Sequence, residues 1–390
     1  MELNKEETEI LNGRDGNAAA KSMEILYALG EIFGAEKLID ISSVQVAGVS
    51  YNNLGDAGLE YLNNLAVDGK VKVKTMLNPA GMDLIDWKKM GIEEDFAQKQ
   101  IKVIEAFKKL GIRISATCTP YLIGIEPKIG EHIAWSESSA VIYANSVLGA
   151  KTNREGGPSA LAAAIVGKTP CYGLHLDKNR QAEIKVFVES NPKNEADFSA
   201  LGYSIGKKIE NKIPLIYGIK NATGEELKNF GASLATYGGT AIFHMDGITP
   251  NKTTIPGDSV NISKTDIADA YDFLNDREEI DFVSVGCPHA SIAEIQSIAK
   301  QIEGKSVKKP FWICIARKTK EKADELGLVK PIEQAGVLFA CDTCMAVSPL
   351  KNRFKCMATN SAKACFYGRG TNNFNVRLMS LEDCIKEATE

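Results

Sequence analysis

Three cysteines stand at positions where metal chemistry is possible. Cys118 ends the apolar segment IRISATC, Cys287 follows IDFVSVG, and Cys344 follows VLFACDT. We predict that each of these segments contains a strand, and ligands of open α/β sheets bind in the crevice beyond the carboxyl ends of such strands. Three thiolates that meet there could hold a metal centre. A single cysteine at the end of a strand is more often a core residue, so the pattern alone only suggests such a centre.

The other cysteines show no comparable pattern. The chain has nine cysteines in 390 residues, and an odd number without a secretory signal argues against a disulfide framework. Cys341 and Cys344 form a C-x-x-C, which could be half of a zinc site or a redox pair. A zinc ribbon needs a second C-x-x-C, and the sequence has none. We assign Cys171 and Cys314 to the core.

Alternating strands and helices must position these cysteines. Apolar runs predict strands in the segments 38–42, 71–77, 112–118, 213–219, 240–248, 280–286, 311–316 and 337–341. Helical periodicity connects several of them, and Ser291 with Glu294 forms a capping box that predicts a helix start. This alternation predicts an α/β fold with mainly parallel sheets. Because residues 190–212 are polar, we place a domain boundary near residue 200, which gives an N-terminal region 1–200 and a C-terminal region 201–390.

Charge and composition weigh against several classes of partner. The net charge is -4 and the pI about 5.8, so the chain has no overall attraction to nucleic acid or to an anionic membrane. No apolar run reaches the length of a membrane span, and the polar start MELNKEETEILNG lacks the apolar core of a secretory signal. We therefore expect a cytoplasmic protein that binds neither nucleic acid nor membrane. Neither G-x-x-x-x-G-K-[ST] nor G-x-G-x-x-G after the first strand is present, which argues against nucleotide binding.

Polar segments rich in Gly, Ser and Asn separate the apolar runs. They are GVSYNNLGDAGLE, LNPAGMDL, GEHIAWSESSAVIYANSVLGAKTNREGG and TNSAKACFYGRG. Polar loops that contain glycine can bring backbone N–H groups close to an anionic ligand, although some of these segments must be turns and helix caps. Among four scattered histidines, His289 lies two residues after Cys287 and is the best candidate to support a metal ligand.

These segments resemble the aconitase X family over nearly the whole chain. The resemblance is carried, in the expected order, by SYNNLGDAGLEYL, TMLNPAGMDL, ATCTPYLIGIEPKIGEHIAWSESSAVIYANSVLGAKTNREGG, VGCPHAS, CDTC and TNSAK. It implies an aconitase-like multi-domain architecture without the swivelling fourth domain. That domain would be a separate small subunit, so the resemblance implies a heterodimeric dehydratase, which is a hydro-lyase.

By the same resemblance, Cys118, Cys287 and Cys344 are the ligands of a 4Fe-4S cluster, although 2Fe-2S members exist. One iron of a cubane held by three cysteines is open and can act as a Lewis acid on a hydroxyl and a carboxylate. The substrate contacts that we expect are Gly48, Val49, Ser50, Asn78, Pro79, Glu137, Ser138 and Lys363. No catalytic base is assigned within the chain, because in the superfamily a serine of the swivelling domain serves as the base. Arg154 is a candidate phosphate clamp or, equally, part of a structural salt bridge beneath the site.

The activity implied by the resemblance is the dehydration of (R)-5-phosphomevalonate to trans-anhydromevalonate 5-phosphate in a modified mevalonate pathway. This substrate is preferred because the chain resembles the unfused, archaeal type of large subunit. Other members of the family dehydrate cis-3-hydroxy-L-proline, and the sequence leaves that alternative open. From other classes, an iron–sulfur sensor or RNA-binding aconitase relative is disfavoured by the mild acidity, and a zinc-binding structural protein is a further alternative.

Overall fold

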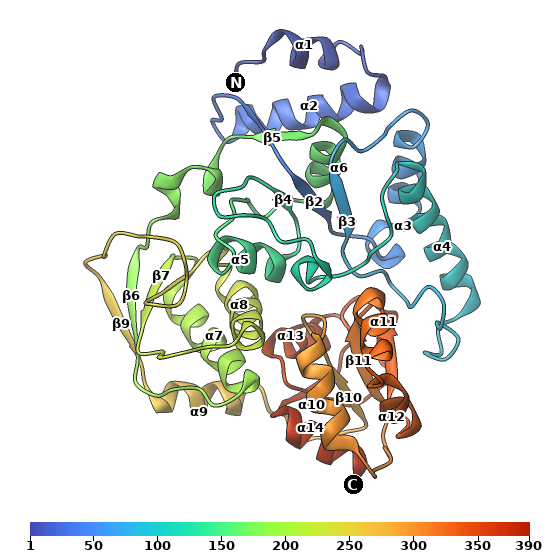
Figure 1. The fold of residues 1–390 in the computed structure, drawn as a ribbon, viewed down its shortest axis with the longest axis vertical. Helices are drawn as coiled ribbons and strands as arrows, with labels where there is room; N and C mark the ends of the chain where they lie inside the picture. Colours follow the sequence, from blue (N-terminus) through green and yellow to red (C-terminus); the bar gives the residue numbers. More distant parts are fainter.

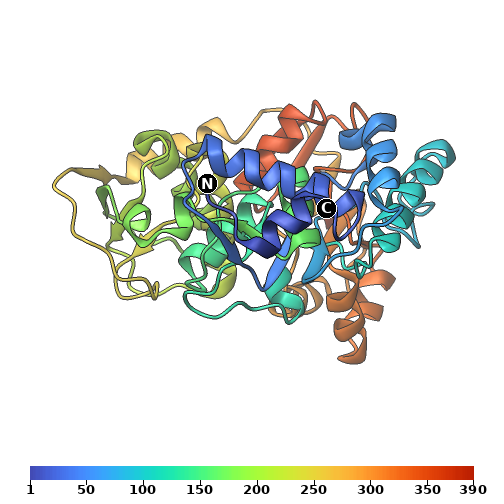
Figure 2. The same ribbon diagram turned by 90° about the horizontal axis from the view of Figure 1, so that it is seen from above.

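Three consecutive units, each built on its own parallel sheet, form the computed structural model, which describes all residues 1–390. In Figure 1 the first unit, blue to green, lies at the top, the second, green to yellow, at the left, and the third, orange to red, at the bottom. The view from above in Figure 2 places the second unit and the helices α3 and α4 at opposite ends of the molecule. The predicted α/β class with mainly parallel sheets is confirmed.

The first unit is built on a three-stranded parallel sheet of order β3-β2-β4, and every residue of its central strand β2 is buried. A separate antiparallel pair joins β1 to β5. Apolar residues of α2, α4 and α6 pack with the sheet in one core. Its elements are α1 (Lys5–Leu11), α2 (Asn17–Ile32), β1 (Leu38–Asp40), β2 (Ser43–Val46), α3 (Tyr51–Leu65), β3 (Lys74–Leu77), α4 (Glu94–Lys109), β4 (Ala134–Trp135), α5 (Ser138–Ser146), α6 (Gly157–Val166) and β5 (Lys168–Pro170).

The second unit has a four-stranded parallel sheet of order β8-β7-β6-β9. Its core joins the inward faces of α7 and α8 to these strands, and Ile142 of α5 packs into the same core. Its elements are β6 (Ile184–Val188), α7 (Glu195–Ile209), β7 (Pro214–Tyr217), α8 (Gly224–Gly238), β8 (His244–Met245), β9 (Ser259–Ile262) and α9 (Lys264–Phe273).

The third unit has a five-stranded parallel sheet of order β12-β11-β10-β13-β14. The predicted capping box at the start of α10 is present, with both hydrogen bonds between Ser291 and Glu294 formed. Its elements are β10 (Phe282–Val285), α10 (Ile292–Ile302), β11 (Phe311–Ile315), α11 (Arg317–Glu325), α12 (Val329–Gln334), β12 (Leu338–Cys341), β13 (Cys356–Thr359), α13 (Ala362–Gly370), β14 (Asn375–Leu378) and α14 (Leu381–Thr389).

Each sheet has a point at which the chain reverses its direction of winding. The chain runs outward from β2, β6 or β10 on one side and then returns to place β4, β9 or β13 on the other side. Such switch points leave a crevice outside the carboxyl ends of the strands. The crevices of the first and third sheets face each other, because Ala80, after β3, donates its N–H to the carbonyl of Asp342, after β12, at 2.8 Å.

Two sequence predictions need correction or refinement. Residues 112–118 do not form a strand: Ala116 makes a single bridge to Leu77 of β3, and upstream of it a cavity separates the two segments. Cys118 therefore follows an extended loop, which is held at this point by the N–H of Thr117 on the Leu77 carbonyl at 2.8 Å. The boundary expected at residue 200 falls inside α7, so the regions 1–200 and 201–390 do not follow the three sheets.

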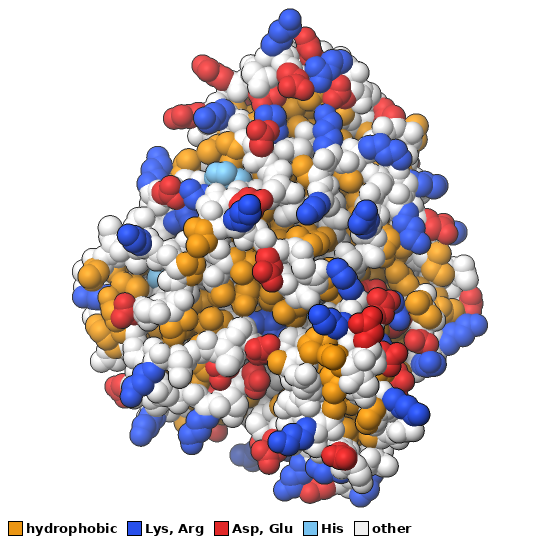
Figure 3. Space-filling model, in the orientation of Figure 1, with side chains coloured by type: hydrophobic (Ala, Val, Ile, Leu, Met, Phe, Trp, Pro, Cys, Tyr) orange, Lys and Arg blue, Asp and Glu red, His pale blue; other side chains and the backbone are white.

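The surface of the molecule shows no dominant charge on the face drawn in Figure 3. Basic and acidic side chains are interspersed there, with hydrophobic side chains between them. Mixed charges of this kind give only weak long-range steering of a charged partner. None of the helices combines the length and the apolar character that crossing a membrane would require.

Candidate active site

One cavity brings the three selected cysteines together. It lies where the carboxyl ends of β2, β3 and β4 face those of β10, β12 and β13, and Cys118, Cys287 and Cys344 line it with Glu137 and Lys363. Its volume of about 270 Å³ is close to the lower end of the range for small-molecule pockets. The cavity is therefore sized for a small ligand rather than for a polymer.

The donor set fits a metal cluster better than a single ion. No three His, Cys, Asp or Glu side chains converge closely enough to hold one metal ion. In a cubane each thiolate binds a different iron, so the ligand sulfurs stand apart around a shared centre. Cys118, Cys287 and Cys344 come from three separate loops and are each 7% exposed, which leaves them open to the cavity and shielded from bulk water.

The acidity of these thiols depends on their burial. Burial raises the pKa of Cys118 to about 12, and it also raises the pKa of Cys287 and of Cys344. In the protein alone the thiols are therefore neutral at ordinary pH. Iron ions would supply the positive charge that stabilises the thiolates, because a coordinating thiol loses its proton.

His289 connects the loops of all three cysteines. Its backbone N–H donates to Sγ of Cys118 at 3.2 Å, and its ring lies 3.1 Å from the Thr117 hydroxyl through Nδ1 and 2.9 Å from the Thr343 carbonyl through Nε2. A carbonyl only accepts, so Nε2 carries the proton and Nδ1 accepts from Thr117. Burial lowers the pKa of His289 to about 4, which keeps the ring neutral. The prediction that His289 supports a metal ligand stays a prediction, and this geometry suits it.

A buried ion pair forms part of the cavity floor. Lys363 donates to the carboxylate of Glu137, and its Nζ lies 3.4 Å from the Ser138 hydroxyl and 3.2 Å from that of Ser139. Burial alone would raise the pKa of Glu137, but the charge and hydrogen bond of Lys363 outweigh it and lower that pKa to about 2. Burial acts against the charge of Lys363 as well, and attraction to Glu137 leaves its pKa raised. Both groups are therefore charged, and each neutralises the other.

Helix starts position this pair. Glu137 is the N-cap of α5 and accepts from the N–H of Ser139 at 3.3 Å. Lys363 was expected in a polar loop, but it is the second residue of α13, which Ser361 caps by accepting from the N–H of Ala364 at 3.3 Å. A Ser at the N-cap stabilises the first turn of a helix, and this explains why the polar segment TNSAK begins a helix and is not a loop.

Two polar features of the floor have no partner within the protein. Asn78 donates from Nδ2 to Glu137 at 2.9 Å, whereas its buried Oδ1 has no hydrogen-bond partner. The backbone N–H groups of Gly48, Val49 and Ser50, in the turn beside the floor, have no protein acceptor, and of these three residues only Gly48 lines the cavity. Buried polar groups normally pair, so an unpaired acceptor beside unpaired donors marks a place for a ligand with a hydroxyl and an anionic group.

The rim of the cavity is formed by exposed or half-buried side chains. Asn53, Arg154 and Thr371 are exposed and Tyr367 is half-buried, and all four line the cavity. No ion pair to Arg154 forms, and no hydrogen bond involves the side-chain polar atoms of the four. The salt bridge that was the alternative role of Arg154 is therefore absent.

The structure brings most of the predicted site residues together. Gly48, Asn78, Pro79, Glu137, Ser138 and Lys363 line the cavity with the three cysteines. Val49 and Ser50 lie in the adjoining turn but do not line the cavity: the carbonyl of Val49 accepts from Gln100, and the hydroxyl of Ser50 donates to the Val347 carbonyl. Asn53, Tyr367 and Thr371 also line the cavity and were not predicted from the sequence. Asn53 belongs to the family-matching segment SYNNLGDAGLEYL and Tyr367 to the polar segment TNSAKACFYGRG, and position within those segments was the only available indication.

The remaining cysteines are separate from the cavity lining. Cys341 is buried in the core of the third sheet and does not line the cavity, whereas Cys344 does, so the two thiols of the C-x-x-C are not presented to the same cavity. Cys314 is fully buried in β11, with Sγ 3.7 Å from the Ser284 hydroxyl, as expected for a core residue. Cys171 was expected in the core and is only partly buried, because it follows the short β5 pair at the edge of the first unit.

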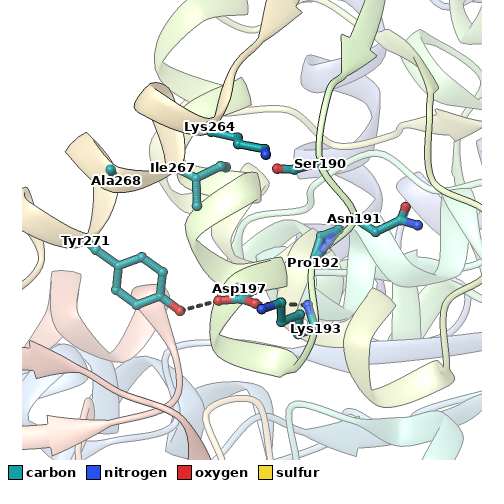
Figure 4. Close-up of a pocket in the computed structure, with 9 residues that line it drawn as sticks. All are labelled: Ser190, Asn191, Pro192, Lys193, Asp197, Lys264, Ile267, Ala268 and Tyr271. Atoms are coloured by element: carbon teal, nitrogen blue, oxygen red, sulfur yellow. Dashed lines mark hydrogen bonds between the residues drawn. The ribbon is translucent and has the colours of Figure 1, made fainter.

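A second cavity lies at the switch point of the second sheet, between β6 and β9. Ser190, Lys193, Asp197, Lys264 and Tyr271 are among its lining residues (Figure 4). Asp197 accepts from the Tyr271 hydroxyl at 2.7 Å and from the N–H of Lys193 at 2.9 Å. Both oxygens of the only carboxylate that lines this cavity thus accept hydrogen bonds within the protein. No cysteine or histidine lines the cavity.

The geometry agrees with comparisons to known proteins. Three family models match in order: the aconitase X first domain over residues 1–178, the second domain over 182–272 and the third domain over 280–390. A crystal structure of Thermococcus kodakaraensis aconitase X in its holo-form superposes with a TM-score of 0.93 at 46% sequence identity, covering 100% of both chains.

Curated relatives carry two different names. The phosphomevalonate dehydratase large subunits of Methanocaldococcus jannaschii and Thermococcus kodakarensis are 48% and 47% identical, with 99% and 100% of this chain and 100% of each relative covered. The cis-3-hydroxy-L-proline dehydratase of Hypocrea jecorina is 33% identical over 100% of this chain and 69% of that protein. By its three domain models, its full-length relatives and its superposition, this chain belongs to the aconitase X family.

Proposed function

We propose that this chain is the large subunit of a dehydratase that removes water from (R)-5-phosphomevalonate and gives trans-anhydromevalonate 5-phosphate. The observation that carries the proposal is the match to phosphomevalonate dehydratase large subunits along the whole of both chains. The cavity supports it, because Glu137 and Lys363 neutralise each other and leave Arg154 as an uncompensated positive charge. A phosphorylated carboxylic acid suits that charge better than hydroxyproline does.

We further propose that Cys118, Cys287 and Cys344 hold a 4Fe-4S cluster. Their origin in three loops around one cavity, without convergence on one point, supports a cluster. When bound, such a cluster supplies Lewis-acid character at the iron that lacks a cysteine ligand, which favours departure of a hydroxyl. Neutral thiols would lose their protons as the metal binds, so cluster assembly should be favoured at higher pH.

The chain's own residues would orient the substrate above this centre. The unpaired Oδ1 of Asn78 accepts a hydrogen bond from a substrate hydroxyl, and the free N–H groups of the turn at Gly48 donate to a carboxylate or phosphate oxygen. The pair of Glu137 and Lys363 gives the floor a fixed dipole that need not reorganise when charge develops. Burial of this floor excludes water from the reacting carbon.

Neither Glu137, which lines the cavity, nor the neighbouring His289 is suited to take the proton from that carbon. Glu137, with a pKa near 2 and an ion pair to Lys363, is a weak base, and both ring nitrogens of His289 are already hydrogen-bonded. We therefore propose that the base comes from a small-subunit partner, as a swivelling domain that closes over the rim. The relatives' name, large subunit, supports such a partner.

The test is an anaerobic assay of this chain, with reconstituted cluster, in the presence and absence of the matching small subunit. Phosphomevalonate and cis-3-hydroxy-L-proline are offered separately, and the products are followed by mass spectrometry. We expect dehydration of phosphomevalonate by the assembled pair and none by either subunit alone. Turnover of hydroxyproline alone would overturn the substrate, and full activity of the isolated chain would overturn the assignment of the base.

A further inference from the structure

We propose that Arg154 binds the phosphate of the substrate at the cavity rim and thereby sets the preference for a phosphorylated acid. The inference deepens the proposed function and rests on it. It decides between the two roles that the sequence left open for Arg154 and divides the cavity into two parts: a buried floor for the reacting hydroxy acid and a rim for the distal phosphate.

The charges of the cavity single out Arg154. Two cationic side chains line it, Lys363 and Arg154, together with one anionic side chain, Glu137. Lys363 is buried and paired with Glu137, so its charge is already balanced. Arg154 forms no ion pair, and the carboxylate of its neighbour Glu155 instead accepts from the Ser159 hydroxyl at 2.6 Å. A multiply charged anion in this cavity therefore meets one free cation from this chain.

The backbone beside Arg154 is held firmly although its side chain is exposed. The N–H of Glu155 donates to the Trp135 carbonyl at 3.0 Å. The side chain of Asn153 donates to the Tyr172 carbonyl at 3.1 Å and accepts from the N–H of Leu174 at 2.8 Å. A guanidinium carried on a fixed backbone loses less freedom on binding than one carried on a loose loop.

The loop of Arg154 also packs against the turn that offers free N–H groups. At Gly157, three residues further on, a Cβ atom would lie 2.6 Å from the Ala47 carbonyl oxygen, so only glycine permits this approach. The adjoining Gly48, with φ of +80°, lines the cavity and has an N–H without a protein acceptor. Arg154 and this turn thus present a charged fork and a backbone donor to the same space.

Other rim groups complete a site for a tetrahedral anion. Tyr367, Asn53 and Thr371 line the same cavity. An arginine binds two phosphate oxygens at once, and neutral hydroxyl and amide donors can bind the remaining ones. The cysteines lie at the floor, so a molecule with its hydroxyl near them and its phosphate at Arg154 spans the cavity from floor to rim.

The test compares Arg154→Met and Arg154→Lys with wild type and with Arg277→Met, a control that removes an exposed arginine outside the cavity. Each chain is assembled with the small subunit and carries a full cluster. We measure KM for phosphomevalonate and inhibition by inorganic phosphate and by unphosphorylated mevalonate. Loss of a charge-assisted contact should raise KM by about ten- to a hundredfold in Arg154→Met. The KM of Arg154→Lys should lie between those of wild type and Arg154→Met, because a lysine ammonium keeps the positive charge but cannot bind two phosphate oxygens at once.

The two inhibitors separate a phosphate site from a general defect. Arg154→Met should lose inhibition by inorganic phosphate and keep its inhibition constant for mevalonate within twofold. An unchanged KM for phosphomevalonate, or equal weakening of mevalonate and phosphomevalonate, would overturn the role of Arg154. If wild type itself does not turn over phosphomevalonate, the proposed function fails first, and the wild-type measurement shows this independently of the variant.

Discussion

The switch points of the first and third sheets face each other, whereas that of the second sheet stands alone. The facing edges enclose buried thiols, an ion pair and unpaired polar groups. The lone edge, between β6 and β9, carries an open cavity whose carboxylate, Asp197, is occupied by its own neighbours. All three sheets share the same winding, so topology supplies a crevice in each case.

The comparison indicates that a crevice beyond the strand ends becomes an active cavity when the edge of a second sheet covers it. The two facing edges exclude water from the groups between them. This burial raises the pKa of Cys118 and favours the ion pair between Glu137 and Lys363. At the lone edge Lys193 and Lys264 remain exposed to water. Opposition of two sheets, rather than any one sheet, therefore defines the active cavity.

The largest effect is expected when a cysteine between the two facing edges is replaced, and this replacement is the strongest test of the comparison. Cys118→Ser, Cys287→Ser and Cys344→Ser should each lose the brown chromophore and all measurable dehydration, because serine is a poor ligand for iron. Iron and sulfide content, visible absorbance and activity of anaerobically prepared protein give the measurement.

The control for the cysteine series is Cys384→Ser. Cys384 is fully buried in α14 and lies outside the cavity, so this change costs some stability and leaves the cluster in place. Full iron retention in all three cavity variants would contradict the assignment of the ligands. Loss of iron in Cys384→Ser as well would mean that misfolding, rather than ligation, explains the series.

The next largest effect is expected at the ion pair. Lys363→Met leaves the buried carboxylate of Glu137 without its partner, and breaking a buried pair typically costs about 3–5 kcal/mol of unfolding free energy. Urea unfolding of cluster-free protein measures this loss. Turnover should also fall, because the floor loses its fixed charge.

A double variant separates stability from function at this pair. Lys363→Met combined with Glu137→Gln removes both charges, so most of the lost stability should return while kcat/KM stays low. Recovery of activity together with stability would show that the pair is a scaffold without a role in the reaction.

Much of the fold was predictable because its strands are strongly apolar. β7, β10, β11 and β12 lie within the predicted segments. β6 and α7 were missed because they begin in a polar region, where tertiary packing in the second core decides the structure. Residues 112–118 have the composition of a strand, yet only Ala116 bridges to β3, since register and pairing partners are not encoded in local sequence.

The active site, like the fold, could be predicted only in part from the sequence. The cysteine ligands and the polar segments were identified by position and family resemblance, and the cavity unites most of them. The pairing of Glu137 with Lys363 was not predicted, because these residues are 226 positions apart and meet through two different sheets. The absence of a salt bridge at Arg154 likewise depends on side-chain positions that no motif specifies.

A smaller effect is expected when the hydrogen bond between Thr117 and the His289 ring is removed. Thr117→Val leaves Nδ1 of His289 and the N–H of Thr119 without their hydrogen-bond partner, at a cost of about 1–3 kcal/mol. The cluster's reduction potential should shift as well, because the N–H of His289 donates to Sγ of Cys118. Thr359→Val is the matched control: its buried hydroxyl has no partner, so stability should stay the same or rise and the potential should not change. Equal effects in both variants would remove His289 from this role.

The smallest effects come from one matched change at the two cavities. Tyr367→Phe removes a hydroxyl that has no protein partner and lines the active cavity, so KM for phosphomevalonate should rise by only a few fold and the melting temperature should stay unchanged. Tyr271→Phe removes the hydroxyl that donates to Asp197 at the lone edge, so unfolding free energy should fall by about 1 kcal/mol and KM should not move. Kinetics and thermal unfolding of both variants, each in the assembled pair, measure the two quantities. A rise in KM for Tyr271→Phe would show that the lone edge takes part in catalysis, and the contrast between facing and lone edges would then fail.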